Sequence, residues 1–287
     1  PTEADPEAIQ SFTFCAMVEF CEGEDHTLDK PDDYEHWKSM NPFFLDAVFG
    51  TPQRTTGFFE HRYFHGGMRM APAWFYRSTV DPANFVGPDK PRPRSVINVT
   101  CNDYHFETFL EKDNADQVLQ RARALTRAYI YWLQTEAPRD EGGQGYPEIR
   151  LLPEATGTDD GIAQAPYIRE GRRLDAYTQV IEQDIVAEFQ AGARARRFDD
   201  SIALGCFAVD IHRCVNRAGM NRSSKPYQVP LSAMLSPQLS NFAVAGKPIG
   251  TTHITNGAYR LHPIEWAIGE AAGHFADFCL SNQLPSD

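Results

Sequence analysis

The sequence predicts a mixed α/β fold, and three observations support that prediction. Short stretches rich in β-branched and aromatic residues, such as 11–19 and 95–100, are typical of strands. Residues 114–136 place apolar side chains three and four positions apart, which is the spacing of one helix face. Residues 242–280 run from an apolar segment through a loop of small residues to a second helical pattern. In open α/β sheets this order of elements marks the edge where ligands bind.

Further strands are expected along the chain, most of them short. The segment 242–246 is expected to be a buried strand, because both of its faces are apolar. A turn signal, His-Gly-Gly at 65–67, separates two aromatic-rich strand candidates. The remaining expected strands are 57–64, 73–79, 202–212 and 227–231.

Two helices are expected with defined ends. Asn114 is a plausible N-cap of the first helix, and Pro138 follows its end. Pro263 suits the first turn of the second helix, which we expect over 263–280. The apolar side of that helix is predicted to consist of Ile264, Ala267, Ile268, Ala271, Ala272, Phe275 and Phe278.

Composition argues against several classes of function. The chain has 27 basic and 39 acidic residues, a formal net charge of −12. Such a surface repels phosphate backbones and anionic lipids, so we expect neither nucleic-acid nor membrane binding. There is no apolar run of the ~18 residues that a membrane helix needs. The acidic first residues do not resemble a secretory signal, and a cytoplasmic location is expected.

Motifs of other enzyme classes are missing. The six cysteines form no C-x-x-C pair and the nine histidines show no H-E-x-x-H spacing, so we predict no metal site and expect free, buried thiols. An α/β-hydrolase is disfavoured because no G-x-S-x-G elbow is present.

The loop and helix start within 241–273 suit an electron-rich ligand. Glycines such as Gly250 and Gly257 let the backbone approach a flat molecule closely. A helix N-terminus together with Arg260 would stabilise negative charge on such a ligand. Alternatively, Arg260 forms a surface ion pair with Glu265 or Glu270.

The motifs of this stretch resemble the C-terminal FAD motif of the FAD-dependent oxidoreductase family, which is related to the fumarate reductase and succinate dehydrogenase flavoproteins. They are Phe-Ala-Val-Ala-Gly-Lys at 242–247, Thr-His at 252–253, Asn-Gly-Ala-Tyr-Arg-Leu-His-Pro at 256–263 and Gly-Glu-Ala-Ala-Gly at 269–273. Similar upstream segments are Tyr-Ile-Arg-Glu-Gly-Arg-Arg at 167–173, Phe-Asp-Asp-Ser-Ile at 198–202, Asp-Ile-His at 210–212 and Tyr-Gln-Val-Pro at 227–230. Several motifs in order are harder to obtain by chance than one.

The resemblance implies FAD as cofactor and a set of contacts to it. It places Gly257, Ala258, Arg260 and Leu261 along the isoalloxazine ring, and Ala245, Gly246 and Lys247 near the ribityl and phosphate part. Thr252, His253 and Asn256 complete the predicted cofactor contacts.

One part of the family pattern is absent. No Gly-x-Gly-x-x-Gly fingerprint, which holds the pyrophosphate, occurs in the chain. We therefore expect a heteromer in which a second polypeptide supplies the N-terminal FAD-binding half. Alternatively, the chain is one fragment of a cleaved precursor, and the absence of an initial Met fits that idea. The C-terminal strand, loop and helix would then complete a Rossmann-like domain.

Candidate catalytic residues flank the same motifs. His262 and His253 are each either a general base, a covalent flavin link or a histidine that binds a backbone carbonyl. Asp210 and His212 form either a carboxylate-oriented base or a strand terminus. Arg169 either binds a substrate carboxylate or belongs to a structural ion-pair network.

The predicted activity is oxidation of a small amine, alcohol or amino-acid-like substrate by hydride transfer to flavin. Arg260, His262 and His212 are the expected catalytic residues, and Arg169, Asp210 and Tyr104 the expected substrate contacts. For Tyr104 a plain polar loop is the favoured alternative. The alternative is a non-catalytic partner subunit that caps FAD bound to another chain. The expected portions are 1–150 on the substrate side, 151–240 facing substrate and flavin, and 241–287 completing the FAD domain.

Overall fold

The structure is a computed structural model, and it describes residues 5, 7–40, 43, 64–65, 68–69, 73–139 and 142–284. It is a mixed α/β protein, as predicted. The chain divides into two compact units, each with its own hydrophobic core. Unit 1 consists of Pro1–Gln10 and Arg169–Asp287, and unit 2 of Ser11–Ile168. The expected portions 1–150, 151–240 and 241–287 are defined by motifs rather than by packing, and they stay predictions.

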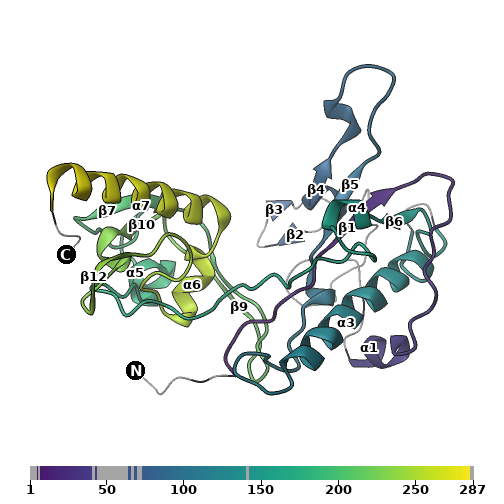
Figure 1. Ribbon diagram of the computed structural model, residues 1–287, viewed down its shortest axis with the longest axis horizontal. Helices are drawn as coiled ribbons and strands as arrows, with labels where there is room; N and C mark the ends of the chain where they lie inside the picture. The colour runs from purple at the N-terminus through teal and green to yellow at the C-terminus, as the bar shows by residue number, and fades with distance from the viewer. Residues whose placement is uncertain are drawn as a thin grey trace. The chain divides into compact units, whose positions relative to one another are not determined.

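Unit 2 is built on a four-stranded antiparallel sheet (Figure 1). Its strand order is β4 (Ser78–Val80), β5 (Arg94–Ile97), β1 (Ala16–Phe20) and β6 (Ile149–Leu151). β1 is central and pairs Val18 with Ser95 on one side and with Leu151 on the other. Val18 is fully buried, as expected for a β-branched residue in a central strand.

The predicted helix at 114–136 is confirmed as α3 (Ala115–Thr135), which forms much of the core of unit 2. Val118, Ala122, Leu125 and Leu133 are fully buried along one side of it. Asn114 stands at the N-cap position, but its side chain makes no capping hydrogen bond. The other elements of unit 2 are α1 (Tyr34–Met40), α2 (Ala73–Tyr76), α4 (Pro153–Thr156), β2 (Phe64–His65) and β3 (Met68–Arg69).

The aromatic stretch at 73–79 differs from its prediction. Residues Ala73–Tyr76 form the one-turn helix α2, and strand β4 begins only at Ser78. Trp74 is buried while the next two residues, Phe75 and Tyr76, are exposed, so the stretch lacks the alternation of a strand. β2 and β3 pair antiparallel. The glycines of the predicted turn at 65–67 lie outside the described residues, as does the predicted strand at 57–64 except for its last residue.

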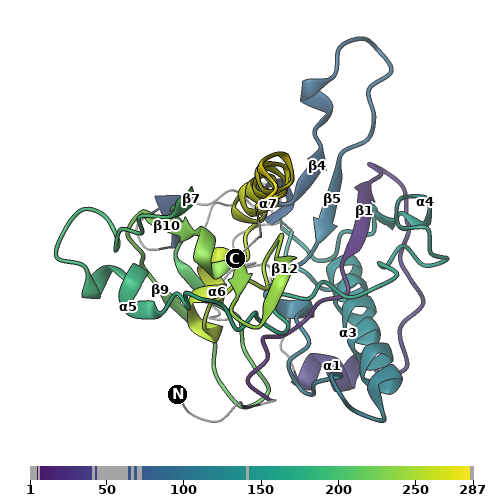
Figure 2. The same cartoon turned by 60° about the vertical axis from the view of Figure 1, so that its left-hand side comes forward.

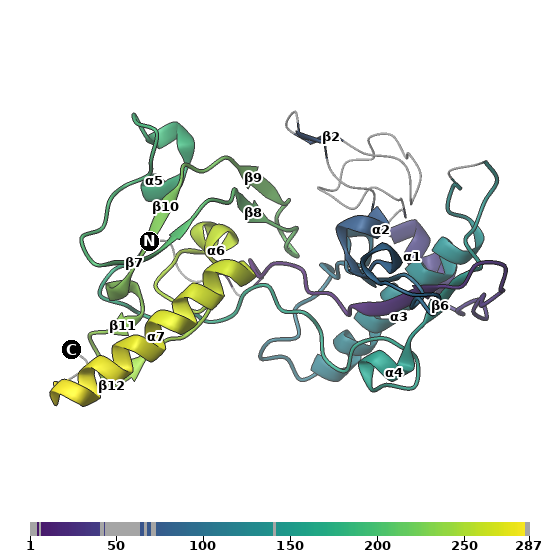
Figure 3. The same ribbon diagram turned by 90° about the horizontal axis from the view of Figure 1, so that it is seen from above.

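Unit 1 contains three two-stranded antiparallel sheets. They pair β7 (Ser201–Gly205) with β10 (Tyr227–Pro230), β8 (Val209–Ile211) with β9 (Met220–Arg222), and β11 (Leu235–Ser236) with β12 (Leu239–Ala243). The helices are α5 (Glu182–Ile185), α6 (His253–Tyr259) and α7 (His262–Asn282). Figure 1 shows α7 along β7, and Figure 3 shows α6 beside β8. The predicted helix at 263–280 and the strand at 227–231 are confirmed. The expected strand at 202–212 is instead two strands, β7 and β8, which belong to different sheets.

The prediction of a buried strand at 242–246 is wrong. β12 ends at Ala243, Leu239 and Phe242 are about half exposed, and only Val244 of the segment is buried. Within the described part of the chain β12 (Figure 2) pairs only with β11, and its Leu239 and Phe242 side chains remain partly in solvent.

Helix α7 also exposes apolar residues. Ile264 and Ile268 of the predicted apolar side are buried, but Phe278 is 58% exposed. Trp266 and Leu280 are 78% and 80% exposed. No helix in the described residues is long and apolar enough to cross a bilayer.

Candidate functional site

The candidate site lies in unit 1, where α6 packs directly on strand β8. Gly257 makes this close approach possible. A Cβ atom at this position would lie 2.7 Å from the backbone oxygen of Asp210 and 2.7 Å from Cδ1 of Ile211. Only glycine allows two backbones to come this near without displacement. The packing brings the two motif stretches, 210–212 and 253–260, into contact.

The start of α6 is fixed by its cap. The Oγ1 atom of Thr252 accepts a hydrogen bond from the backbone N–H of Thr255, at 3.1 Å. The hydroxyl of Thr255 donates to the backbone oxygen of Val180, at 2.7 Å. Side-chain caps of this kind satisfy helix N–H groups that have no partner within the helix. They hold His253 as the first residue of the helix.

Arg260 stands at the end of α6 and is 4% exposed. Its Nη2 atom donates to the backbone oxygen of Asp210 at 3.0 Å and lies 3.6 Å from Oδ2 of the same residue. The Arg260 guanidinium therefore pairs with Asp210, rather than with the Glu265 or Glu270 of the alternative prediction. A buried guanidinium needs a partner of opposite charge, and Asp210 provides it.

Asp210 and His212 form a carboxylate–histidine pair, with 3.3 Å between Oδ2 and Nε2. Burial works against ionisation of Asp210, but the His212 hydrogen bond and the charges of His212, Arg260 and Arg169 outweigh it, so the pKa of Asp210 lies below its ordinary value. The carboxylate is therefore charged at neutral pH and orients the imidazole. About a fifth of the His212 side chain is exposed, which leaves it reachable.

A second carboxylate–histidine pair lies on the start of α6. Nδ1 of His253 is 2.9 and 3.0 Å from the two carboxylate oxygens of Glu170, whose side chain is 2% exposed. Arg173 also contacts Glu170, at 3.3 Å. A buried carboxylate that holds one ring nitrogen fixes the tautomer of a histidine.

Gln10 connects the two pairs, and sequence reasoning missed it. Its backbone N–H donates to Oε1 of Glu170 at 2.8 Å. Its side-chain Oε1 accepts from the backbone N–H of His212 at 2.9 Å and from Nη2 of Arg260 at 3.4 Å. Its Nε2 is buried with no hydrogen-bond partner among the described residues. Nothing in the sequence signals this role, because Gln10 lies 202 positions before His212.

The predicted loop contacts of the cofactor are partly accessible. Ala245 is exposed, while Gly246 and Lys247 are half-buried. Gly246 has φ +147°, a conformation that disfavours other residues. Asn256 ties this loop to α6, because its Nδ2 donates to the backbone oxygen of Lys247 at 3.1 Å. Its Oδ1 atom is buried with no partner among the described residues, an acceptor that a hydroxyl of a bound group would satisfy.

The remaining predicted residues are scattered more widely. Ala258 is fully buried, and its backbone oxygen accepts a hydrogen bond from the Tyr227 hydroxyl at 2.7 Å. The backbone oxygen of Ala258 thus has a partner within unit 1. Leu261 is half-buried and His262 is exposed at the first residue of α7.

The two remaining predicted substrate contacts, Arg169 and Tyr104, lie in different units. Arg169 is 2% exposed in unit 1, and its charge contributes to the low pKa of Asp210. Tyr104 is in the core of unit 2, where its hydroxyl donates to Oε1 of Glu107 at 3.0 Å. The structure thus brings Arg169, Asp210, His212 and Arg260 together, and it places Tyr104 in the core of the other unit.

The fold and this cluster define a mixed α/β protein with two histidines, each oriented by a carboxylate, beside a buried arginine. Comparison with protein families makes the class specific: the profile of the FAD dependent oxidoreductase family matches residues 6–287. The chain belongs to this family, as predicted from its motifs, and membership implies FAD as cofactor. No curated protein and no solved structure gives a significant match.

Proposed function

We propose that the chain forms the substrate-side part of an enzyme that oxidises a small amine, alcohol or amino-acid-like molecule. When bound, FAD supplies the hydride acceptor. The observation that carries the proposal is the Asp210–His212 pair beside the buried Arg260. In this reading the chain provides the groups that bind and deprotonate the substrate.

His212 is the proposed general base. Asp210 accepts from Nε2–H of the neutral ring, which makes Nδ1 the nitrogen that takes the substrate N–H or O–H proton. The charged Asp210 then stabilises the imidazolium. The Arg260 guanidinium donates to the backbone oxygen of Asp210 and so fixes that residue. The positive charge of Arg260 would stabilise negative charge that develops on the substrate or the flavin. His262, the other predicted catalytic histidine, is proposed only as a group near the cofactor.

The cofactor would lie against the loop of Ala245, Gly246 and Lys247. The accessible loop and the buried acceptor of Asn256 suit a ligand that carries hydroxyl groups. Thr252 and His253 would line the same region from the start of α6. Gly257 and Ala258 would fix the position of α6 relative to this region, because Gly257 packs on β8 and the Ala258 backbone oxygen binds the Tyr227 hydroxyl.

A second polypeptide that carries the nucleotide-binding half is part of the proposal. Its support is an apolar stripe on the outer side of α7, formed by Trp266, Gly269, Gly273, Ala276 and Leu280. These residues follow one another at spacings of three and four, and Cβ atoms built on the two glycines meet no atom within 4 Å. Small residues between large apolar ones let another helix or sheet approach closely. β12 of the same unit also exposes two apolar side chains, Leu239 and Phe242.

The catalytic proposal is tested on the complex isolated from its source cells, by its flavin absorption and the intact mass of each chain. Bleaching of the flavin band is followed in single turnover with a panel of amines, alcohols and amino acids. The variant His212→Gln is expected to slow bleaching about 10²- to 10⁴-fold, the usual effect of losing a general base, with unchanged flavin content. His274→Gln, an exposed histidine of α7, is the matched control. Equal bleaching rates for His212→Gln and wild type would exclude His212 as the base.

The alternative, a non-catalytic subunit that caps FAD on another chain, predicts a different pattern. Turnover would then survive Arg260→Gln and His262→Gln once the complex has assembled. The variant Trp266→Glu tests the partner surface separately, because it places a charge in the stripe without touching the core. We expect it to lose the second chain and the flavin together, whereas Phe189→Glu, at an exposed site on a 3₁₀ turn, should retain both. Retention of both by Trp266→Glu would argue against the stripe as the interface.

A further inference from the structure

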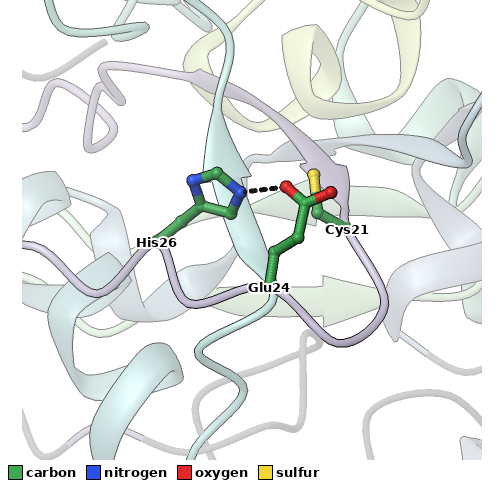
Figure 4. A group of neighbouring side chains, drawn as sticks. All are labelled: Cys21, Glu24 and His26. Atoms are coloured by element: carbon green, nitrogen blue, oxygen red, sulfur yellow. Dashed lines mark hydrogen bonds and ion pairs between the residues drawn. The ribbon is translucent and has the colours of Figure 1, made fainter.

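The loop after β1 in unit 2 gathers three side chains of metal-binding type. The Sγ atom of Cys21, a carboxylate oxygen of Glu24 and a ring nitrogen of His26 all lie within 4.8 Å of one another (Figure 4). Thiolate, imidazole and carboxylate are the three ligand types that Zn²⁺ takes in proteins. Cys21 is buried, His26 is half-buried and Glu24 is exposed, so the cluster opens to solvent on one side.

The backbone of this loop is fixed at both ends. The N–H of Cys21 donates to the backbone oxygen of Glu148 at 2.9 Å, and the N–H of His26 donates to that of Pro147 at 2.8 Å. The backbone oxygen of His26 accepts from Nε2 of Gln134 at 2.7 Å, and Gln134 belongs to the buried side of α3. The positions from which two ligands project are therefore set by the fold, which lowers the cost of ordering them around an ion.

A tight turn brings the third ligand into place. The N–H of Glu24 donates to the backbone oxygen of Cys21 at 3.0 Å, and Gly23 inside the turn has φ +77°, a conformation that favours glycine. The carboxylate of Glu24 thereby comes within 2.8 Å of Nε2 of His26.

A positive side chain occupies the open side of the cluster. Nη2 of Arg92 lies 2.5 Å from Oε1 of Glu24, and its Nη1 lies 3.9 Å from Oε2 of Glu19. About half of the Arg92 side chain is exposed, so its guanidinium can turn toward solvent. An exposed ion pair of this kind is weak and is replaced readily by a stronger cation.

We propose that Cys21, Glu24 and His26 bind a Zn²⁺ ion, with a fourth position open to water or an external ligand. Binding displaces the thiol proton of Cys21 into solvent and moves Arg92 away from Glu24. The mixed sulfur, nitrogen and oxygen ligands favour zinc over magnesium or calcium, which prefer oxygen alone. Searches for C-x-x-C and H-E-x-x-H spacing miss this C-x₂-E-x-H arrangement, which is why the sequence predicted no metal.

The test uses the purified full chain, first stripped with a chelator and then titrated with Co²⁺ as a spectroscopic probe for zinc. One equivalent is expected to bind and to give a thiolate-to-cobalt charge-transfer band, which Zn²⁺ then removes. Cys21→Ser should abolish the band, and His26→Gln should weaken binding more than about 100-fold, since even an outer partner of a ligand is worth about 10- to 100-fold. Arg92→Gln should bind at least about threefold more tightly, because the competing cation is gone.

Two variants serve as controls for accidental binding. Cys206→Ser removes an exposed thiol of unit 1, and His36→Gln removes an exposed histidine of unit 2. Both should titrate as wild type does. The proposal is overturned if wild type shows no charge-transfer band, if the band persists in Cys21→Ser, or if Cys206→Ser removes it. An unchanged affinity in Arg92→Gln would overturn the competition between Arg92 and the ion.

Discussion

Replacing Gly257 by alanine should push α6 away from β8. The added Cβ would stand 2.7 Å from the backbone oxygen of Asp210, whereas ordinary contact begins at 3.4 Å, so the helix must retreat by about 0.7 Å (3.4 − 2.7). Backbone cannot rotate aside as a side-chain end can. Overpacking of this kind costs about 1–3 kcal/mol.

Alanine has a higher helix propensity than glycine, by up to ~1 kcal/mol, and this gain would offset part of the destabilisation caused by the clash. The variant Gly273→Ala in α7 separates the two effects, because a Cβ there meets nothing within 4 Å. We expect Gly257→Ala to be about 1–3 kcal/mol less stable than Gly273→Ala in urea unfolding of the isolated chain. Hydrogen exchange of the amides at 256–260 should speed up in the first variant alone, since the loss is local. If Gly257→Ala unfolds at the same urea concentration as Gly273→Ala, the close approach of α6 to β8 is not as described.

Two further predictions concern the same packing. Tyr227→Phe removes the 2.7 Å hydrogen bond to the buried backbone oxygen of Ala258 and should cost about 1–3 kcal/mol in urea unfolding; an unchanged midpoint would mean that another donor reaches this oxygen. The low pKa of Asp210 means that its contribution to stability is present above the unfolded value of about 3.9 and is lost as the pH falls through the lower folded value. The urea midpoint of wild type should therefore fall more steeply below about pH 4 than that of Asp210→Asn, and parallel curves would contradict the shift.

Local patterns predicted the strongly periodic elements of the fold. α3 follows from apolar residues at helical spacing that ends near Pro138, and β10 from a short β-rich segment. Helix α7 follows from Pro263 and the Ile264–Ile268 pair, both of which are buried. The pattern was sufficient to predict these elements, although in α7 the burial follows it only at Ile264 and Ile268, and Phe278 is exposed.

The failures have a common physical cause. An apolar run such as 242–246 shows that a segment needs burial, but it does not show what buries it. Leu239 and Phe242 of β12 are about half exposed, and among the described residues the strand pairs only with β11. The one-turn helix at Ala73–Tyr76 escaped prediction because a run of three aromatic residues suits strands as well as helix turns.

The parts of the candidate site that are contiguous in sequence could be predicted. Asp210 with His212 and the run ending at Arg260 stand out as motifs, and the structure brings them together. The partners that orient the histidines and link the pairs were harder to find. Gln10 lies far away in sequence, and the contact of Glu170 with His253 depends on how two distant segments fold.

Gln10 and Glu170 also stand at the two points where the chain leaves unit 1 and returns to it, and the Gln10 N–H donates to the Glu170 carboxylate. At the matching ends of unit 2, Thr13 and Tyr167 exchange two backbone hydrogen bonds, of 3.2 and 2.7 Å. Unit 2 is thus an insertion whose ends adjoin, and each unit could be excised as a separate polypeptide. A short linker from residue 10 to residue 169 would retain both histidine–carboxylate pairs, whereas a fragment starting at 169 would lack the glutamine that joins them.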